Sequence, residues 1–458
     1  MKIILHMLYV RLFLLIWPVF VFGCSPRSAN LTLPFEPPKA FSSHASQALS
    51  ERWWTAFGDA RMDSLVNRAL QSNFSLETAW HRLRSAQAVV DREGAGRFPT
   101  LEVSGRGEVQ RPDSENNAQI RLGITSEYEI DLWGQIRSGV DAARYRMRAT
   151  EADYQTAALS LSAEVVRTYF QLMEAQNQHE LFEHQIETNQ QVLSLIRARF
   201  GSGQIRSVDI LRQRQLIEST REQKIATESR IEVLEHQLAV LSGYAPQDGI
   251  AYTHRALPDL PPLPYTGLPV ELIQRRPDVK RAYNLLLAAD RDVAVAISNR
   301  YPRLSLTALA SGDDRGGLFK DWVGNLIGNL LLPVIDGGER GAEIKRNQAN
   351  KSAQLSAYGQ TVLTAFAEVE NALVQEQKQV ERIASLEAQV ALARQTYDQL
   401  RLEYLNGISD YLDVLTALTN EQRLRRALIS AKLDLLEFRI ALYRALAGGF
   451  EIARNKSL

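Results

Sequence analysis

The sequence has little that could cross-link the fold or attract a partner by charge. Cys24 is the only cysteine among 458 residues, so no disulfide within the chain holds the fold together. The 53 basic residues balance the 53 acidic ones, which gives no global bias toward nucleic acid or anionic surfaces. The apolar run LFLLIWPVFVFG, residues 12–23, is too short to span a bilayer as a helix. A disulfide scaffold is therefore excluded, and the composition does not favour a nucleic-acid binder.

Residues 1–23 have the pattern of a signal peptide. Basic residues lie around a short apolar segment, which places the mature chain outside the cytoplasm. The Gly23-Cys24 pair resembles the lipobox of bacterial lipoproteins, in which the thiol is acylated and becomes the mature N-terminus. In such lipoproteins Ser25, rather than Asp, after the cysteine suits outer-membrane retention. We therefore expect lipidation at Cys24 and an extended tether over residues 24–50; the alternative is an incidental cysteine in a cleaved signal.

Two halves of the sequence repeat each other at an offset of about 204 residues. The matching pairs are GRFPTLEVSG (96–105) with NRYPRLSLTA (299–308), EIDLWGQIRSG (129–139) with PVIDGGERGAE (333–343), and FGSGQIRSVDIL (200–211) with LNGISDYLDVL (405–415). The offset is too long for a solenoid, so we expect one duplicated half. The predicted parts are a first repeat at 51–256, a Pro-rich linker at 257–269, a second repeat at 270–449 and a C-terminal tail at 450–458.

Each half contains two segments in which apolar and polar residues alternate, a period that predicts strands. They predict β-hairpins at about 100–133 and about 303–336. Their length suits a transmembrane strand of roughly 9–11 residues, but four strands cannot close a barrel in lipid. Inserted strands therefore require several chains to share a barrel, two giving 8 strands and three giving 12. The alternative is a small soluble hairpin packed on helices.

A long stretch without glycine or proline follows the first hairpin. Val140–Phe200 covers about 60 residues, or roughly 90 Å as a helix. Apolar residues recur there at three- and four-residue steps, which is typical of a coiled-coil seam. The second half repeats this pattern. The sequence predicts long helical hairpins at about 136–243 and about 339–447, which must pack on other long helices.

The order of these segments resembles that of the TolC-type outer-membrane efflux channels, most closely the lipidated OprM-like (NodT) branch. The motifs that carry the resemblance are YEIDLWG (128–134), RRPDV (275–279), YPRLSLT (301–307), GERGAEI (338–344), YLNGISDYLDVLTA (404–417) and LYRALAGG (442–449). The resemblance implies a mixed, mainly α fold: a homotrimer with a 12-stranded barrel in the outer membrane, a smaller mixed equatorial region and a long periplasmic α-helical barrel. It implies an exit duct that passively conducts small molecules delivered by an inner-membrane pump and a periplasmic adaptor.

Other classes remain open from the residues alone. They are a type I secretion exit channel, a periplasmic adaptor and a soluble periplasmic coiled-coil lipoprotein. An adaptor should carry one helical hairpin, whereas this sequence predicts two. We expect no enzyme activity, cofactor or metal, because the seven histidines lack ligand spacing and no phosphate loop is present. The sequence does not indicate which molecules the protein would transport.

The resemblance also places a periplasmic gate at the helical tips, where the family closes its pore by ionic and hydrogen-bonded contacts. Tyr404 and Asp413 match gate positions, and Asp410 is a weaker neighbour. Thr416 and Thr419 stand where relatives carry an aspartate and an arginine. The gate is therefore expected to be less ionic, or to be built with two residues of the first repeat, Asp209 and Arg212. The alternative is that Asp413 is a surface carboxylate and Tyr404 packs in the helix seam.

The tip turns are also the expected contacts for the adaptor. Short grooves between coiled-coil pairs suit the docking of a helix. The residues in question are Gly201 and Gly203 in the first repeat and Gly407 and Ile408 in the second.

Overall fold

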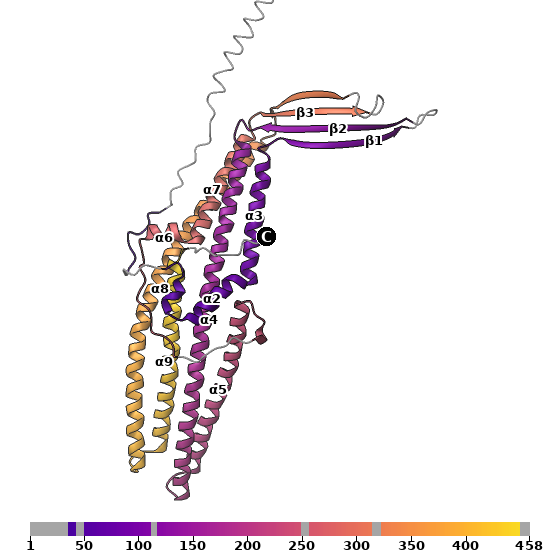
Figure 1. Cartoon of the computed structure of the whole chain (residues 1–458). Helices are drawn as coiled ribbons and strands as arrows, with labels where there is room; N and C mark the ends of the chain where they lie inside the picture. Colours follow the sequence, from indigo (N-terminus) through magenta and orange to yellow (C-terminus); the bar gives the residue numbers. More distant parts are fainter. Residues whose placement is uncertain (1–34, 43–49, 111–116, 249–255, 314–321, 449–458) are drawn as a thin grey trace, which may run out of the picture. The chain divides into compact units, whose positions relative to one another are not determined.

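The computed structural model describes residues 35–42, 50–110, 117–248, 256–313 and 322–448 (Figure 1). Cys24 and the expected signal peptide lie outside these residues. The chain divides into two units. One unit holds the described residues of His81–Glu151 and Arg281–Gln360, and the other holds those of Pro37–Trp80, Ala152–Lys280 and Thr361–Leu458. No helix among the described residues has both the length and the hydropathy needed to cross a membrane.

The first unit contains one antiparallel sheet of four strands in the order β1-β2-β3-β4 (Figure 1). The strands are β1 (Thr100–Gln110), β2 (Asn117–Ile130), β3 (Arg303–Asp313) and β4 (Val323–Leu331). β1 and β3 each contain 11 residues and lie at an offset of 203, as the repeat predicts. Within the described residues β1 and β4 each pair with only one strand, so the sheet has two open edges.

The register sorts the side chains of this sheet onto two unlike faces. Val103 pairs with Ile124, and Ile124 pairs with Ala310, so these side chains share one face. Apart from Ser126, that face is mainly apolar across all four strands: Leu101, Val103, Val109, Ile120, Leu122, Ile124, Leu304, Leu306, Ala308, Ala310, Leu326 and Leu330. The opposite face carries Glu102, Ser104, Arg106, Glu108, Gln119, Arg121, Thr125, Glu127, Ser305, Thr307, Ser311, Asn325 and Asn329. Apolar side chains also lie among the polar ones on this second face: Leu309 of β3, and Val323, Ile327 and Leu331 of β4.

Four helices lead into and out of the sheet. They are α3 (Phe74–Ala95), α4 (Gln135–Gly201), α7 (Pro277–Ser298) and α8 (Glu339–Leu405). The two repeats meet at aromatic residues of the motifs YEIDLWG and YPRLSLT: the Trp133 ring stacks on Tyr301, with ring centroids 4.7 Å apart. The Trp133 indole N–H also donates to the Pro302 carbonyl at 2.7 Å.

The long helices reproduce the duplication residue by residue. α4 and α8 both contain 67 residues, and both begin and end at an offset of 204. The helices that return from the tips, α5 (Ser207–Leu241) and α9 (Tyr411–Leu446), begin at the same offset. Gly203 and Gly407 occupy equivalent turns with φ of 73° and 77°, values at which glycine avoids a side-chain clash. The internal two-fold repeat is therefore confirmed.

In the second unit, contacts place the helices in the order α5, α4, α9, α8. Lys224 of α5 pairs with Glu183 of α4 at 2.9 Å. The Gln178 side chain of α4 donates to the Arg426 carbonyl of α9 at 2.9 Å. The Gln379 side chain of α8 donates to the Ala431 carbonyl of α9 at 2.8 Å. α5 and α8 thus stand at the two ends of the row.

A hydrophobic core packs two short elements of the second unit, η1 (Trp53–Phe57) and α2 (Ala60–Ser72), against α4, α5 and α9. The other short elements of this unit are η2 (Pro246–Asp248) and α6 (Pro269–Arg275). Trp53 and Trp54 are fully buried, and Trp53 stacks on Tyr443 with ring centroids 5.5 Å apart. Burial of such large rings is the main source of stability here.

The Pro-rich linker is held by a buried ion pair. The Arg439 guanidinium of α9 bonds both carboxylate oxygens of Glu376 on α8, at 2.7 and 2.6 Å. It also donates to the carbonyls of Pro261 and Pro262. Both charged side chains are almost completely buried, so each charge is stabilised by the opposite charge of its partner.

Phe41 and Ser42, within the expected tether, pack against α8. Phe41 is buried, with its ring 6.2 Å from that of Phe366 on α8. Ser42 donates through its backbone N–H and its hydroxyl to the Glu370 carboxylate. The segment predicted as an extended tether therefore has a fixed point on α8 near residue 41.

Candidate functional site at the helical tips

A cavity of about 600 Å³ lies between the two tip turns. Its lining residues come from both repeats: Arg199, Gln204, Ile205, Arg206, Asp209, Tyr404, Leu405, Asn406, Gly407, Ser409, Asp410 and Tyr411. The structure therefore brings three of the five expected gate residues to one place: Tyr404, Asp410 and Asp209.

Arg199 is the residue that joins the two turns, and the sequence did not single it out. Its guanidinium donates to the carbonyls of Tyr404 at 2.9 Å and Leu405 at 2.6 Å, which end α8. It also lies over the Tyr404 ring, 4.8 Å from the centroid. A cation is favourable at a helix C-terminus, where carbonyls have no partner within the helix. The last turn of α4 thus caps the last turn of α8.

Tyr404 packs in the interior of the tip, as the alternative interpretation of the sequence expected. It is buried against Tyr411, with ring centroids 5.7 Å apart. Burial raises the pKa of the Tyr404 hydroxyl, while the neighbouring Arg199 acts in the opposite direction. Among the described residues the Tyr404 hydroxyl has no hydrogen-bond partner, whereas the Tyr411 hydroxyl donates to Gln213. The Tyr404 side chain therefore contributes packing rather than a polar link.

Asp209 and Asp413 occupy equivalent positions of the two repeats but have different surroundings. Asp209 is buried, with Arg212 at 3.3 Å and Arg206 at 3.9 Å from its carboxylate oxygens. Asp413 is exposed in the first turn of α9, and its backbone N–H donates to the carbonyl of the N-cap residue Asp410. Asp410 is itself exposed, and its side chain makes no cap hydrogen bond. Within one chain the ionic contacts of the tip thus belong to the first repeat.

Thr416 and Thr419, which differ from the family pattern, do not line the cavity. The hydroxyls of Thr416 and Thr419 donate to carbonyls of their own helix, those of Leu412 and Leu415, at 2.8 Å. The turn residues are open to contact: Gly201, Gly203 and Gly407 are exposed, and the Ile408 side chain is 75% exposed.

A chain of buried amides continues from the tip along the α4–α9 junction. The Gln422 and Asn189 side chains bond each other, with the shorter contact at 3.1 Å. The Gln185 amide donates to the Gln422 carbonyl and accepts from Arg426 at 2.6 Å. Sequence reasoning missed these residues because Gln and Asn usually face solvent, and no pattern indicates that α4 packs on two neighbours.

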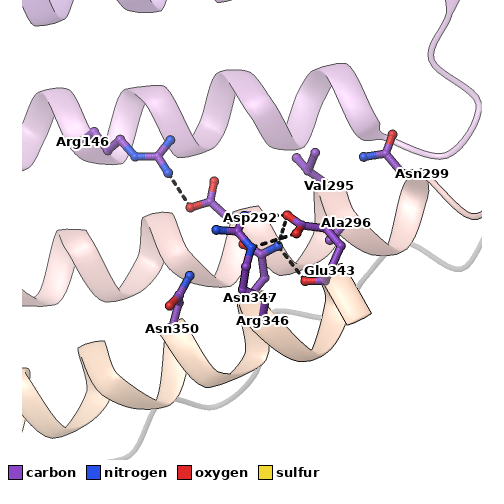
Figure 2. A pocket seen from close by; sticks show the side chains of 9 residues that line it. All are labelled: Arg146, Asp292, Val295, Ala296, Asn299, Glu343, Arg346, Asn347 and Asn350. Carbon is purple, nitrogen blue, oxygen red and sulfur yellow. Dashed lines mark hydrogen bonds and ion pairs between the residues drawn. The ribbon is translucent and has the colours of Figure 1, made fainter. Parts of the chain in front are cut away.

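A second polar cavity, of about 410 Å³, lies between α4, α7 and α8 in the first unit (Figure 2). Figure 2 shows Arg146 reaching Asp292, while Glu343 and Arg346 pair with each other. All four charges are therefore already matched in pairs. The cavity holds no nucleophile beside a base, and this arrangement offers no bond chemistry.

A metal ion requires several ligand side chains grouped together. Among the described residues no three His, Cys, Asp or Glu side chains are grouped so that they could hold an ion. His179 instead makes a hydrogen bond with Glu228 at 3.1 Å, and His184 lies 3.9 Å from Glu180.

The described chain thus combines an amphipathic four-stranded sheet with two long helical hairpins. The family described as outer membrane efflux protein matches residues 65–244 and 268–448, one segment for each repeat. The chain belongs to this family. It works in efflux at the outer membrane and is not an enzyme.

Named relatives and solved structures agree along nearly the whole chain. The pyoverdine export outer membrane protein OpmQ of Pseudomonas aeruginosa is 29% identical, with 94% of each chain covered. The solvent efflux pump outer membrane protein SrpC of Pseudomonas putida is 29% identical, with 87% of each covered. A structure of the outer-membrane channel OprN is 28% identical, covers 92% of this chain and 99% of its own, and has a TM-score of 0.84. The resemblance, the mainly helical fold with four strands per chain, and the efflux channel function expected from the sequence are confirmed.

Proposed function

We propose that three copies of this chain form the exit duct of a tripartite efflux system and pool their sheets into one 12-stranded barrel in the outer membrane. The observation that carries the proposal is the apolar face that runs in register across all four strands, opposite a mostly polar face. Lipid requires the first face, and a water-filled lumen suits the second. The two open edges must be paired in lipid, and joining β4 of one copy to β1 of the next closes the barrel.

Native mass spectrometry of the detergent-extracted protein tests the number of copies. We expect a complex of three chains that survives mild collisional activation. A complex of two chains would correspond to an 8-stranded barrel and would contradict the proposal, as would a monomer.

The tip is proposed as the closed periplasmic end of this duct. Arg199 holds the two turns of each chain together through the carbonyls of α8, with Tyr404 packed beneath it. Asp209 with Arg212 braces the first turn. Asp413 and Asp410 are exposed and lack such contacts, so any closing role for them involves a neighbouring chain.

Arg199→Ala is expected to increase the time that the duct spends open. The change removes two hydrogen bonds from a charged donor, each contributing about 1.5–3 kcal/mol, so the ratio of open to closed time should rise roughly a hundredfold or more. Single-channel recording in planar bilayers measures this ratio. Arg206→Ala is the matched control, since Arg206 is exposed and reaches Asp209 only at 3.9 Å. If the two variants show the same open fraction, Arg199 does not help to close the duct.

The partners proposed are a periplasmic adaptor, which docks at the tip turns, and an inner-membrane pump. Gly201, Gly203, Gly407 and Ile408 are exposed in the two tip turns. Other residues of these turns and Gly407 line a cavity large enough to receive side chains of a helical tip from the adaptor. The relatives named above export pyoverdine and solvents, so small organic molecules are the proposed cargo.

Cys24 is proposed as a lipid anchor that supplements the barrel. One set of acyl chains is a weak sole anchor, so the strands supply most of the membrane affinity. Cys24→Ser should abolish incorporation of labelled palmitate while leaving the conductance of the assembled duct unchanged. Continued labelling of the serine variant would place the lipid elsewhere, and loss of the pore would make the anchor essential rather than supplementary.

A further inference from the structure

The two ends of the helix row carry exposed faces that nothing covers within the described chain. On α5 the face includes Leu211 and Ile225, which are 61% and 64% exposed. On α8 it includes Val374 and Leu392, which are 52% and 63% exposed. Isolated apolar residues on a surface are ordinary, but exposed apolar residues that recur on both end helices of one row suit a contact between copies.

The duplication indicates what that contact is. α4 is the repeat equivalent of α8, and α9 is the equivalent of α5, at a constant offset of 204. The α4–α9 junction inside one chain therefore has an equivalent junction between α8 and α5. These two helices lie at opposite ends of the row, so that junction forms only between α8 of one copy and α5 of another.

The observed contacts of the inner junction can be transferred to the outer one. Gln178 donates to the Arg426 carbonyl at 2.9 Å, and Arg426 donates to Gln185 at 2.6 Å. Adding 204 to the α4 residues gives Arg382 and Gln389, and subtracting 204 from Arg426 gives Glu222. By the same shift Gln422, which bonds Gln185, becomes Glu218.

We propose that α8 of one copy docks on α5 of the next through an ion pair between Arg382 and Glu222, with Gln389 beside Glu218 and Glu222. The proposal rests on the assembly proposed above and specifies its helical contact. The amide contacts of the junction within a chain are replaced between chains by one arginine of α8, Arg382, which meets two glutamates of α5, Glu218 and Glu222. Complementary charge of this kind favours the correct partner and fixes the register.

The side chains at the proposed junction are exposed and can each accept or donate further hydrogen bonds. The Arg382 side chain is 56% exposed and uses only one nitrogen, Nη1, for Asp434 at 3.1 Å and Gln379 at 3.3 Å. Its other N–H groups remain available, since a guanidinium has five donors. Glu222 is exposed and has no ion-pair partner among the described residues. Glu218 is also exposed, and pairs with Arg221 of its own helix at 2.6 Å.

Charge reversal tests the pair in the full-length protein. Arg382→Glu and Glu222→Arg should each convert most of the oligomer to monomer on gels run without heating, because like charges then meet at each junction. The double variant should restore the oligomer. Glu187→Arg, at an exposed position of α4 outside both stripes, is the control and should leave the oligomer intact. Single variants that assemble normally, or a double variant that does not recover, would overturn the proposal.

A cysteine pair gives an independent test that does not depend on electrostatics. Gln389→Cys combined with Glu222→Cys should yield covalently linked dimers and trimers when treated with copper phenanthroline. Gln389→Cys with Ser229→Cys, two turns along the same face, is the control and should yield none. If the protein forms an oligomer but the first cysteine pair does not cross-link, the α8–α5 contact is wrong and the proposed duct is unaffected. If the unaltered protein is a monomer, the proposed contact and the proposed duct are both wrong.

Discussion

Replacing Ile124 with arginine is expected to abolish assembly in the outer membrane, whereas the same replacement of its neighbour Thr125 is not. Ile124 lies in the middle of β2, on the apolar face with Val103 and Ala310. An arginine on the lipid face of a barrel costs about 2–4 kcal/mol at the bilayer midplane, and every copy carries the change. The side chain of Thr125 lies on the opposite face, with Glu102, where an arginine stays in water.

Heat-modifiable migration on gels and partition into outer-membrane fractions measure this difference. The Thr125→Arg variant should migrate as the unaltered protein does, in both unheated and heated samples. The Ile124→Arg variant should show only the unfolded form and be lost from the membrane fraction. If the two variants assemble equally well, the apolar face does not face lipid, and the sheet packs elsewhere.

The second large effect concerns the buried pair between Arg439 and Glu376. Arg439→Leu should lower the free energy of unfolding of the helical region by about 3–5 kcal/mol, because it leaves the Glu376 carboxylate buried without a counter-charge. The variant also frees the Pro261 and Pro262 carbonyls, so the linker should become easier to cleave. Guanidinium unfolding followed by circular dichroism in detergent measures the first effect, and limited proteolysis measures the second.

The double variant Arg439→Leu with Glu376→Leu separates the unpaired charge from the lost packing. Replacing both members of a buried pair by apolar side chains is often neutral, so most of the lost stability should return. The linker should nevertheless remain cleavable, because its carbonyls still lack the guanidinium donors. A single Arg439→Leu variant as stable as the unaltered protein would show that Glu376 finds another partner or becomes protonated at little cost.

Much of the fold followed from sequence because its signals are long and periodic. The duplication at about 204 residues and the long stretch without Gly or Pro predicted the paired 67-residue helices. Alternation of apolar residues predicted the four strands, and the register then placed those residues on one face. Which side chains of the last helix face the core did not follow from the sequence. Leu424, Ala431 and Leu442 are buried together with Leu433, Leu436 and Ile440, because α9 packs against both α4 and α8.

The details of the tip did not follow from sequence, because they depend on which turns meet. The positions of Asp209 and Asp413 are equivalent in the repeat, yet one is buried beside two arginines and the other is exposed. Arg199 looked like one more charge in the last turn of a helix. Its partners are backbone carbonyls of another helix, and a carbonyl is present at every residue. No sequence pattern could therefore identify that contact.

The central claim is that copies of this chain form a duct that is closed at its helical tips. Recording from the purified oligomer in planar bilayers tests it most directly. The account predicts small, discrete conductance steps for the unaltered protein, with a larger and longer-lived open level when Arg199 is replaced by alanine. Oligomer that enters the bilayer but gives no step with either protein would contradict the account.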